Sequence, residues 1–419
     1  MNEFVEQAYA IARKQYENLG VDVDNVMKEL VSIPISIHCW QADDVGGFER
    51  PDASISGGGI QATGSFPGKA RNIAEARQDY EKVFSLIPGK HRLALHASYG
   101  EFGSKFVDRN EITPDHFQGW INWAKQTDIK LDMNSTLFSH PKANDGFTLS
   151  SKSKAIRSFW IEHVKRVRTI SSEIGKELED TCIHNIWIPD GMKDIPVDRA
   201  THRLLLKDSL DEILKQKHAN MQDSLEGKLF GIGSESYVVG SHDFYLSYAI
   251  SNGTLLTMDT GHYHPNESVA DKISSIMPFV KGLLLHVSRG VHWDSDHVVI
   301  LNDDLLQLME EIVRSPSMNR IRLALDFFDA SINRIGAYVS GIRSTQKALL
   351  YSLLQPRDLL LEYEESGQYF QRLALLEELK AMPFGAIWDY LCLKNNVLVG
   401  TAWIQEVEKY EQNILRKRG

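Results

Sequence analysis

Eight short apolar segments alternate with amphipathic segments along this chain, and this alternation constrains the fold more than any other feature. The apolar segments have the length of strands and lie near residues 33–39, 92–97, 129–133, 182–188, 221–228, 255–259, 282–287 and 321–327. Helical patterns occupy much of the sequence between them, at 70–86, 114–125, 153–173 and 199–217. Eight strands that alternate with helices predict a (β/α)8 TIM barrel.

Two points of this interpretation leave alternatives open. The segment at 221–228 (MQDSLEGK) is the least hydrophobic of the eight, and the run LFGIG just after it competes for the same strand. A doubly wound open sheet would use the same elements, but its nucleotide-binding form has a GxGxxG turn after the first strand. The glycine-rich stretch at 57–64 (GGGIQATG) lacks that spacing and a following βαβ unit, so we interpret it as a flexible active-site loop.

The chain divides into a barrel and two helical extensions. We assign residues 1–30 to an N-terminal helical segment, 31–343 to the catalytic barrel and 344–419 to an all-helical C-terminal extension. The leucines of that extension predict that it packs on the barrel or on another subunit.

Composition excludes several classes of protein. The 419 residues carry a formal net charge of -10, spread along the chain, which gives no electrostatic basis for binding nucleic acid. The three cysteines lie far apart without a CxxC motif, so neither a zinc finger nor a disulfide framework is expected. No apolar run reaches the roughly 18 residues that cross a membrane, and the charged amphipathic N-terminus does not resemble a signal peptide. We therefore expect a soluble, cytoplasmic protein.

Carboxylates and imidazoles collect where the last three predicted strands end. Asp259 closes the sixth strand, His286 the seventh and Asp326 the eighth, and the loops add His262, Asp294 and Asp296. Taken singly, an aspartate after a strand is usually a cap or turn residue, but the strands of a barrel deliver all six to one rim. Such ligands suit hard divalent ions, and six exceed the need of one ion, so the sequence predicts two neighbouring ions.

A second pair of residues is ambiguous on its spacing alone. Glu226 and Lys228 would face the same way on a strand, because side chains alternate with a period of two. That arrangement suits a metal-binding carboxylate beside an amine that binds a substrate oxygen. The same spacing occurs in ordinary surface ion pairs, which the spacing by itself favours.

Several motifs together resemble the L-rhamnose isomerase family. They are, in chain order, HCWQADDV, GGIQATG, FSHPKANDGFTLS, NIWIPDGMKD, TMDTGHYHP, LLLHVSR, HWDSDHVV and LALDFFDASINR. The resemblance extends from about residue 5 to the C-terminal LRKRG. It implies the aldose–ketose conversion of L-rhamnose to L-rhamnulose, with a site similar to that of xylose isomerases, which share the barrel and a two-metal centre.

The resemblance also implies a role for each ligand. A first, more structural ion would be bound by Glu226, Asp259, His286 and Asp326. A second, catalytic ion would be bound by His262, Asp294 and Asp296, with Asp259 shared between the two. The metal of the family is usually manganese, which the oxygen and imidazole ligands suit, and cobalt, magnesium or zinc can substitute. Because Glu226 must reach the rim, the fifth strand is expected to end near Lys228, which leaves LFGIG as a loop.

Residues outside the metal set take roles by the same resemblance. Lys228, His96 and Asp326 are the expected catalytic residues, with Lys228 at the carbonyl end of the open sugar and His96 near its ring oxygen. Hydrogen would pass between C1 and C2 as a hydride or through an enediol with a carboxylate base. Four aromatic residues would form the substrate pocket, although core packing explains most of them equally well: Trp187, Trp40, Tyr99 and Phe138.

Alternatives remain for specificity and for the reaction. The triple glycine at 57–59 and the segment at 98–106 differ from what the family leads us to expect, and both lie near the predicted pocket mouth. A relaxed isomerase for L-mannose, L-lyxose or D-allose is therefore the nearest alternative. A metal-dependent phosphoesterase and a non-catalytic sugar-binding module are the others. The resemblance further suggests a homotetramer.

Overall fold

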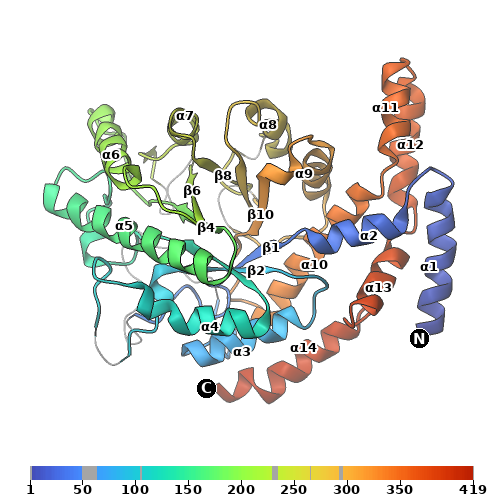
Figure 1. Ribbon diagram of the computed structural model, residues 1–419, viewed down its shortest axis with the longest axis horizontal. Helices are drawn as coiled ribbons and strands as arrows, with labels where there is room; N and C mark the ends of the chain where they lie inside the picture. Colours follow the sequence, from blue (N-terminus) through green and yellow to red (C-terminus); the bar gives the residue numbers. More distant parts are fainter. Residues whose placement is uncertain are drawn as a thin grey trace.

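The computed structural model describes residues 2–49, 64–103, 106–228, 235–264, 266–291 and 296–418. Eight parallel strands close into a barrel, which confirms the predicted (β/α)8 fold (Figure 1). The strands are, in their order around the barrel, β1 (Ile35–His38), β2 (Arg92–His96), β3 (Lys130–Asn134), β4 (Cys182–Ile186), β6 (Met221–Glu226), β8 (Leu255–Asp259), β9 (Leu283–Val287) and β10 (Ile321–Leu325).

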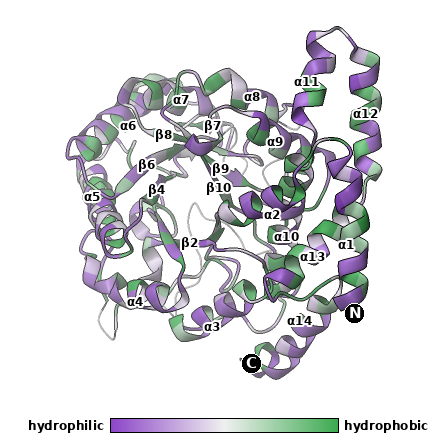
Figure 2. Ribbon diagram, turned by 45° about the vertical axis from the view of Figure 1, so that its right-hand side comes forward, coloured by the Kyte–Doolittle hydropathy of each residue, from purple (hydrophilic) through white to green (hydrophobic). Residues whose placement is uncertain are grey.

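A helix follows each strand, and the helices form a ring around the barrel (Figure 2). They are α3 (Ile73–Phe84), α4 (Gln118–Thr127), α5 (Lys154–Glu177), α6 (Arg199–Leu214), α7 (His242–Asn252), α8 (Val269–Ile276), α9 (Asp303–Arg314) and α10 (Arg334–Leu353). Most begin at a Ser, Asn or Asp whose side chain accepts a hydrogen bond from a backbone amide of the first turn, as Ser153 does from Ile156. Such caps define where the helices start.

The fifth strand is the weakly hydrophobic segment, as the family resemblance implied. β6 pairs with β4 through Cys182 and Met221, and with β8 through Ser224 and Leu255. It ends at Glu226, two residues before the predicted end, and the whole of the competing LFGIG run lies outside the described residues. A short antiparallel pair, β5 (Gly191–Met192) and β7 (Tyr237–Val238), joins the loops that follow β4 and β6.

The barrel interior has an apolar layer directly beneath its C-terminal rim. One side chain from each of four strands meets there, in a cluster of Ile183, Leu255, Leu284 and Ala324. Because side chains alternate across a strand, residues two or four positions further along face the same interior. The strands therefore present polar side chains above an apolar floor, among them Asn185, Asp259, His286 and Asp326.

The helical extensions pack partly on the barrel. They comprise α1 (Asn2–Glu17), α2 (Val23–Ser32), α11 (Arg357–Glu365), α12 (Tyr369–Ala381), α13 (Phe384–Lys394) and α14 (Ala402–Asn413). Tyr9 of α1 stacks on Tyr390 of α13 at 3.8 Å, and Arg418 returns to Asp79 of α3 at 2.7 Å. Helices α11 and α12 project away from the barrel as a hairpin (Figure 1). Helix α10 runs through residue 343, where the sequence placed the end of the barrel.

Among the described residues, no helix is both long and apolar enough to span a membrane.

Candidate metal centre

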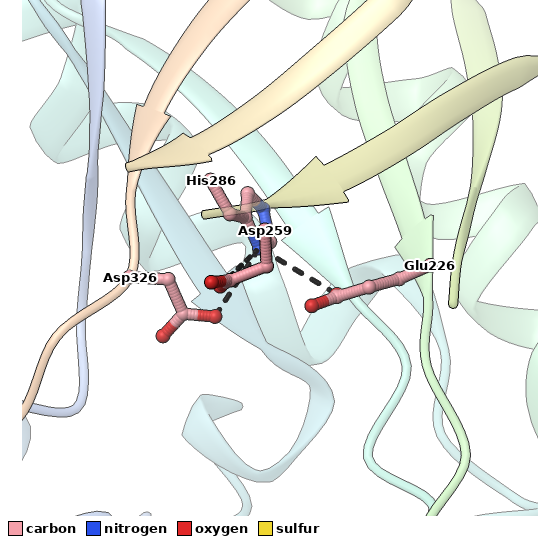
Figure 3. Close-up of side chains that lie close together, drawn as sticks. All are labelled: Glu226, Asp259, His286 and Asp326. Carbon is pink, nitrogen blue, oxygen red and sulfur yellow. Dashed lines mark ion pairs between the residues drawn. The ribbon is translucent and has the colours of Figure 1, made fainter. Parts of the chain in front are cut away.

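Four predicted ligands converge at the C-terminal rim (Figure 3). Glu226, Asp259, His286 and Asp326 come from the ends of β6, β8, β9 and β10, and each offers a ligand atom within 4.8 Å of the others. The Nδ1 atom of His286 lies 3.2 Å from Asp326 Oδ2, 3.5 Å from Glu226 Oε2 and 4.0 Å from Asp259 Oδ2. A nitrogen and three carboxylates around one point form a suitable set for a divalent ion.

A second group shares one of these ligands. Asp259, His262 and Asp296 also place one ligand atom each within 4.8 Å of one another. Asp259 therefore belongs to both groups, as the family resemblance implied for a bridging carboxylate. The remaining predicted ligand, Asp294, lies outside the described residues.

The hydrogen bonds of Asp259 leave one of its oxygens available. Its Oδ1 accepts from the backbone amide of Gly261 at 2.7 Å and from Ser288 Oγ at 2.8 Å. Its Oδ2 is buried and accepts no hydrogen bond within the described part of the chain. A buried oxygen without a donor costs free energy unless something else satisfies it, so the residues present fit a bound cation.

The shifted pKa values around the centre indicate strong electrostatic interactions between its residues. Burial opposes the ionisation of Glu226, but the charges of His286 and His262 and several hydrogen bonds outweigh it and lower its pKa to about 2. Burial raises the pKa of Asp259 to about 7, helped by the carboxylates of Asp326 and Glu226. Burial alone would lower the pKa of His286, yet the carboxylates of Glu226 and Asp326 raise it well above its usual value. The centre therefore stabilises positive charge.

A polar network that the sequence analysis missed orients Glu226. Asn185 Nδ2 donates to Glu226 Oε2 at 2.5 Å, and Asn185 Oδ1 accepts from Thr257 Oγ1 at 2.8 Å. Ser224 Oγ lies 2.6 Å from the same threonine oxygen. Such outer hydrogen bonds hold metal ligands in place. The only signal in the sequence was a polar residue near the end of a buried strand, in CIHNI.

A pocket opens above the predicted metal ligands. Several polar residues and four larger apolar residues line it: Trp40, Val45, His96, Asn134, Ser135, Phe138, Asn185, Trp187, Glu226, Lys228, His262, His286, Asp296 and Asp326. The set includes three of the four predicted aromatic residues. Tyr99 is not among the pocket-lining residues described; it is buried, and its hydroxyl donates to Asp43.

Lys228 reaches this pocket by a route different from the predicted one. The strand stops at Glu226, so strand alternation does not place the two side chains on one face. Instead, the backbone amide of Lys228 donates to Gly240 O at 3.1 Å. Its ammonium group lies 5.0 Å from the centre of the Trp187 ring, a distance at which the ring face attracts a cation.

His96 lines the same pocket from the end of β2. Its Nδ1 is 3.1 Å from Thr136 Oγ1, and its ring packs against those of Trp40 at 5.0 Å and Phe138 at 5.5 Å. Burial, aided by the charge of Arg109, lowers the pKa of His96 to about 3, so the imidazole is neutral at physiological pH. Two segments were predicted to differ from the family. The segment at 98–106 is described except for residues 104–105, and the triple glycine at 57–59 lies wholly outside the described residues.

Comparison with known proteins identifies relatives over almost the whole length. The family model described as L-rhamnose isomerase (RhaA) matches residues 3–418. An L-rhamnose isomerase of Bacteroides thetaiotaomicron is 55% identical over 416 residues, which cover 99% of each chain. One from Enterobacter sp. (strain 638) is 51% identical over 421 residues and covers 100% of both chains, and one from Rhodopirellula baltica is 50% identical over 99% of this chain and 97% of its own.

Proposed function

This chain belongs to the L-rhamnose isomerase family and catalyses the aldose–ketose isomerisation of L-rhamnose, and we propose that two divalent ions at the barrel rim support that reaction. The observation that carries the proposal is the pair of ligand groups that share Asp259 beneath a pocket lined by Lys228, His96 and Trp187. Glu226, Asp259, His286 and Asp326 hold one ion, and Asp259, His262 and Asp296 hold the other together with Asp294.

The ions and the protein contribute different parts of the chemistry. When bound, the ions polarise the carbonyl of the sugar and stabilise negative charge on the neighbouring oxygen. Lys228 donates a hydrogen bond to the oxygen at the carbonyl end. Trp187 and Phe138, whose ring centres are 5.8 Å apart, exclude water from the carbons between which hydrogen moves. His96 binds near the ring oxygen and assists ring opening.

The hydrogen itself follows one of two paths. It moves directly between C1 and C2 as a hydride while a proton passes between O1 and O2, or a carboxylate such as Asp326 removes it from one carbon as a proton and returns it to the other through an enediol. The apolar wall beside Lys228 favours the hydride path, because a hydride must be kept from water. Exchange of the migrating hydrogen with deuterated solvent distinguishes the two.

The ion, the location and the assembly are part of the same proposal. Oxygen and imidazole ligands suit Mn²⁺, with Co²⁺, Mg²⁺ or Zn²⁺ as substitutes. The three cysteines are free and buried, as is usual in the reducing cytoplasm. Exposed apolar side chains on α12 support self-association, with Tyr369 60%, Phe370 77% and Leu373 59% exposed, and we propose a homotetramer. Native mass spectrometry of the purified protein tests this assembly.

The decisive experiment follows L-rhamnulose formation from L-rhamnose by chelator-stripped protein, with and without added Mn²⁺. We expect turnover only with the metal and two ions per chain by elemental analysis. The names of the relatives do not favour L-mannose, L-lyxose or D-allose, so L-rhamnose is expected to react fastest in a panel of these aldoses. Full activity of the ion-free protein would contradict the two-ion proposal.

A further inference from the structure

The hydroxyl of Thr136 is held in place from several directions next to His96. The backbone amide of Thr136 donates to His163 Nε2 at 3.1 Å, and its carbonyl accepts from Arg109 Nη1 at 2.8 Å. The backbone amide of Ser98 donates to Thr136 Oγ1 at 3.3 Å. Because the residue is buried and fixed at its amide, carbonyl and side chain, its hydroxyl has little freedom to choose another partner.

These contacts determine the direction of the hydrogen bond to His96. A threonine hydroxyl has one hydrogen to donate and two lone pairs that accept, and Ser98 already donates to that oxygen. Within the described chain, His96 Nδ1 is the one acceptor in hydrogen-bond range of the Thr136 hydroxyl, at 3.1 Å. The hydroxyl therefore donates, and Nδ1 of His96 accepts.

A neutral imidazole that accepts at Nδ1 carries its hydrogen on Nε2. Burial keeps His96 neutral, as its low pKa indicates. Its Nε2 forms no hydrogen bond with the described residues and is not enclosed by them, and the ring lines the pocket. His96 thus presents an N–H donor to whatever occupies the pocket.

Another histidine of the barrel shows that the partner decides the tautomer. His184 Nδ1 lies 2.9 Å from Asp223 Oδ1, and Asp223 also pairs with Arg168 at 3.0 Å. A carboxylate ionised by an arginine only accepts, so His184 must carry its hydrogen on Nδ1 and accept at Nε2 from Ser135 Oγ, at 2.8 Å. His184 and His96 therefore hold opposite tautomers, because one faces a carboxylate and the other a hydroxyl.

We propose that Thr136 is a positioning residue that fixes His96 as a hydrogen-bond donor toward the ring oxygen of the cyclic sugar. The proposal rests on the assigned isomerase function and extends it to the choice of substrate form. The ring oxygen is an ether and only accepts, so it requires a donor, whereas a hydroxyl of an open sugar pairs with either tautomer. Thr136 thereby favours capture of the closed ring, the form that must be opened before isomerisation.

The test compares two unreactive ligands of the magnesium-loaded enzyme by calorimetry. One is 1,5-anhydro-L-rhamnitol, which has the ring oxygen, and the other is the open polyol L-rhamnitol. For Thr136→Val, which removes the hydroxyl and keeps the shape, we expect the cyclic ligand to bind about five- to tenfold more weakly. The polyol should bind almost as before, and Thr136→Ser should restore binding of the cyclic ligand.

A matched control removes a buried threonine hydroxyl elsewhere. Thr345 donates to Gly341 O inside α10, so Thr345→Val should leave both affinities unchanged. Equal weakening of both ligands by Thr136→Val would show a general structural role and overturn the proposal. Unchanged binding of both would overturn it as well.

A spectroscopic measurement tests the tautomer without kinetics. Selective ¹⁵N labelling of histidine, with His96→Asn to assign the signals, reports which ring nitrogen carries the hydrogen. We expect the hydrogen on Nε2 in the wild type and in Thr136→Ser, and a shift of that population in Thr136→Val. A hydrogen on Nδ1 of wild-type His96 would refute the inference. Failure of the isomerase function is a separate result, namely no turnover of L-rhamnose by the wild-type holoenzyme.

Discussion

The two ends of the barrel interior both hold buried carboxylates, but the charges that surround these carboxylates differ. At the N-terminal end, Asp132 accepts from Arg92 Nη2 and from Ser36 Oγ, each at 2.7 Å, and Asp180 pairs with the same arginine. At the C-terminal end, Asp259 lies close to the like charges of Glu226 and Asp326.

The comparison separates stability from function within one barrel. A buried charge that is paired and hydrogen-bonded costs little, whereas one placed beside like charges is destabilising. The rim retains this destabilising arrangement because the loops and strand ends there bind ligands, whereas the opposite face contributes to stability. Substitutions at the two ends should therefore have opposite consequences.

The largest effect is expected from Asp259→Asn. The variant loses the ligand common to both groups, so kcat/KM for L-rhamnose should fall about a hundred- to a thousandfold. The free energy of unfolding of the ion-free variant should not fall, because an amide removes a buried charge beside two other carboxylates. Isomerase assays and urea unfolding measure the two quantities. Retention of more than a tenth of the activity would contradict the shared-ligand assignment.

The converse substitution is Arg92→Met at the N-terminal end. It leaves Asp132 buried without its partner, which should lower the free energy of unfolding by about 3–5 kcal/mol. The activity per folded molecule should stay within about twofold, since the rim is untouched. Lys90→Met, which breaks an exposed pair with Asp128, is the control and should not measurably change stability. Equal losses of unfolding free energy in both variants would contradict the expected difference between buried and exposed ion pairs.

A smaller effect is expected from Asn185→Ala, behind the proposed metal ligands. Without the amide, Glu226 loses the hydrogen bond that orients it, and Mn²⁺ affinity should fall about tenfold. Asn134→Ala is a matched control from the neighbouring strand, because Asn134 donates to Leu95 O and to no predicted ligand within the described part of the chain. Calorimetric titration of the ion-free proteins with Mn²⁺ measures both. If the control loses as much affinity as Asn185→Ala, the effect is not specific to the support of Glu226.

Sequence periodicity predicted what depends on the local chain. The alternation of strands and helices gave the barrel, and strand ends located the carboxylates and His286, since every parallel strand delivers its last residues to one rim. Long-range geometry was harder to predict. Asn185 supports Glu226 from the neighbouring strand, Lys228 reaches the pocket from a loop, and Tyr99 donates to Asp43 instead of lining the pocket. Sequence spacing predicts none of these three contacts.

The tautomer of His96 also depends on a contact that the sequence does not predict. A histidine at a strand end was recognisable in the sequence, but its role as donor depends on a threonine forty residues further along. The ligand Asp294 remains a prediction, because it lies outside the described residues.

The smallest effect concerns pH and a histidine at the N-terminal end of the barrel. Burial lowers the pKa of His91 to about 4, and its Nδ1 accepts from the backbone amide of Ile35 at 3.2 Å. In the unfolded chain this imidazole titrates near 6.5. Between pH 6.5 and 4 the imidazole is protonated in the unfolded state and neutral in the folded state. The contribution of His91 to the free energy of unfolding is therefore complete above pH 6.5 and is lost as the pH falls toward 4.

The substitution His91→Gln removes the group that binds this proton in the unfolded state. We expect the slope of unfolding free energy against pH to decrease by at most about 1.4 kcal/mol per pH unit between pH 6.5 and 4. Other buried histidines, such as His38 and His163, keep a slope in both proteins. Urea unfolding of the ion-free proteins at several pH values measures the difference. An unchanged slope would show that His91 has the same pKa in the folded and unfolded chains, and would contradict the expected effect of its burial.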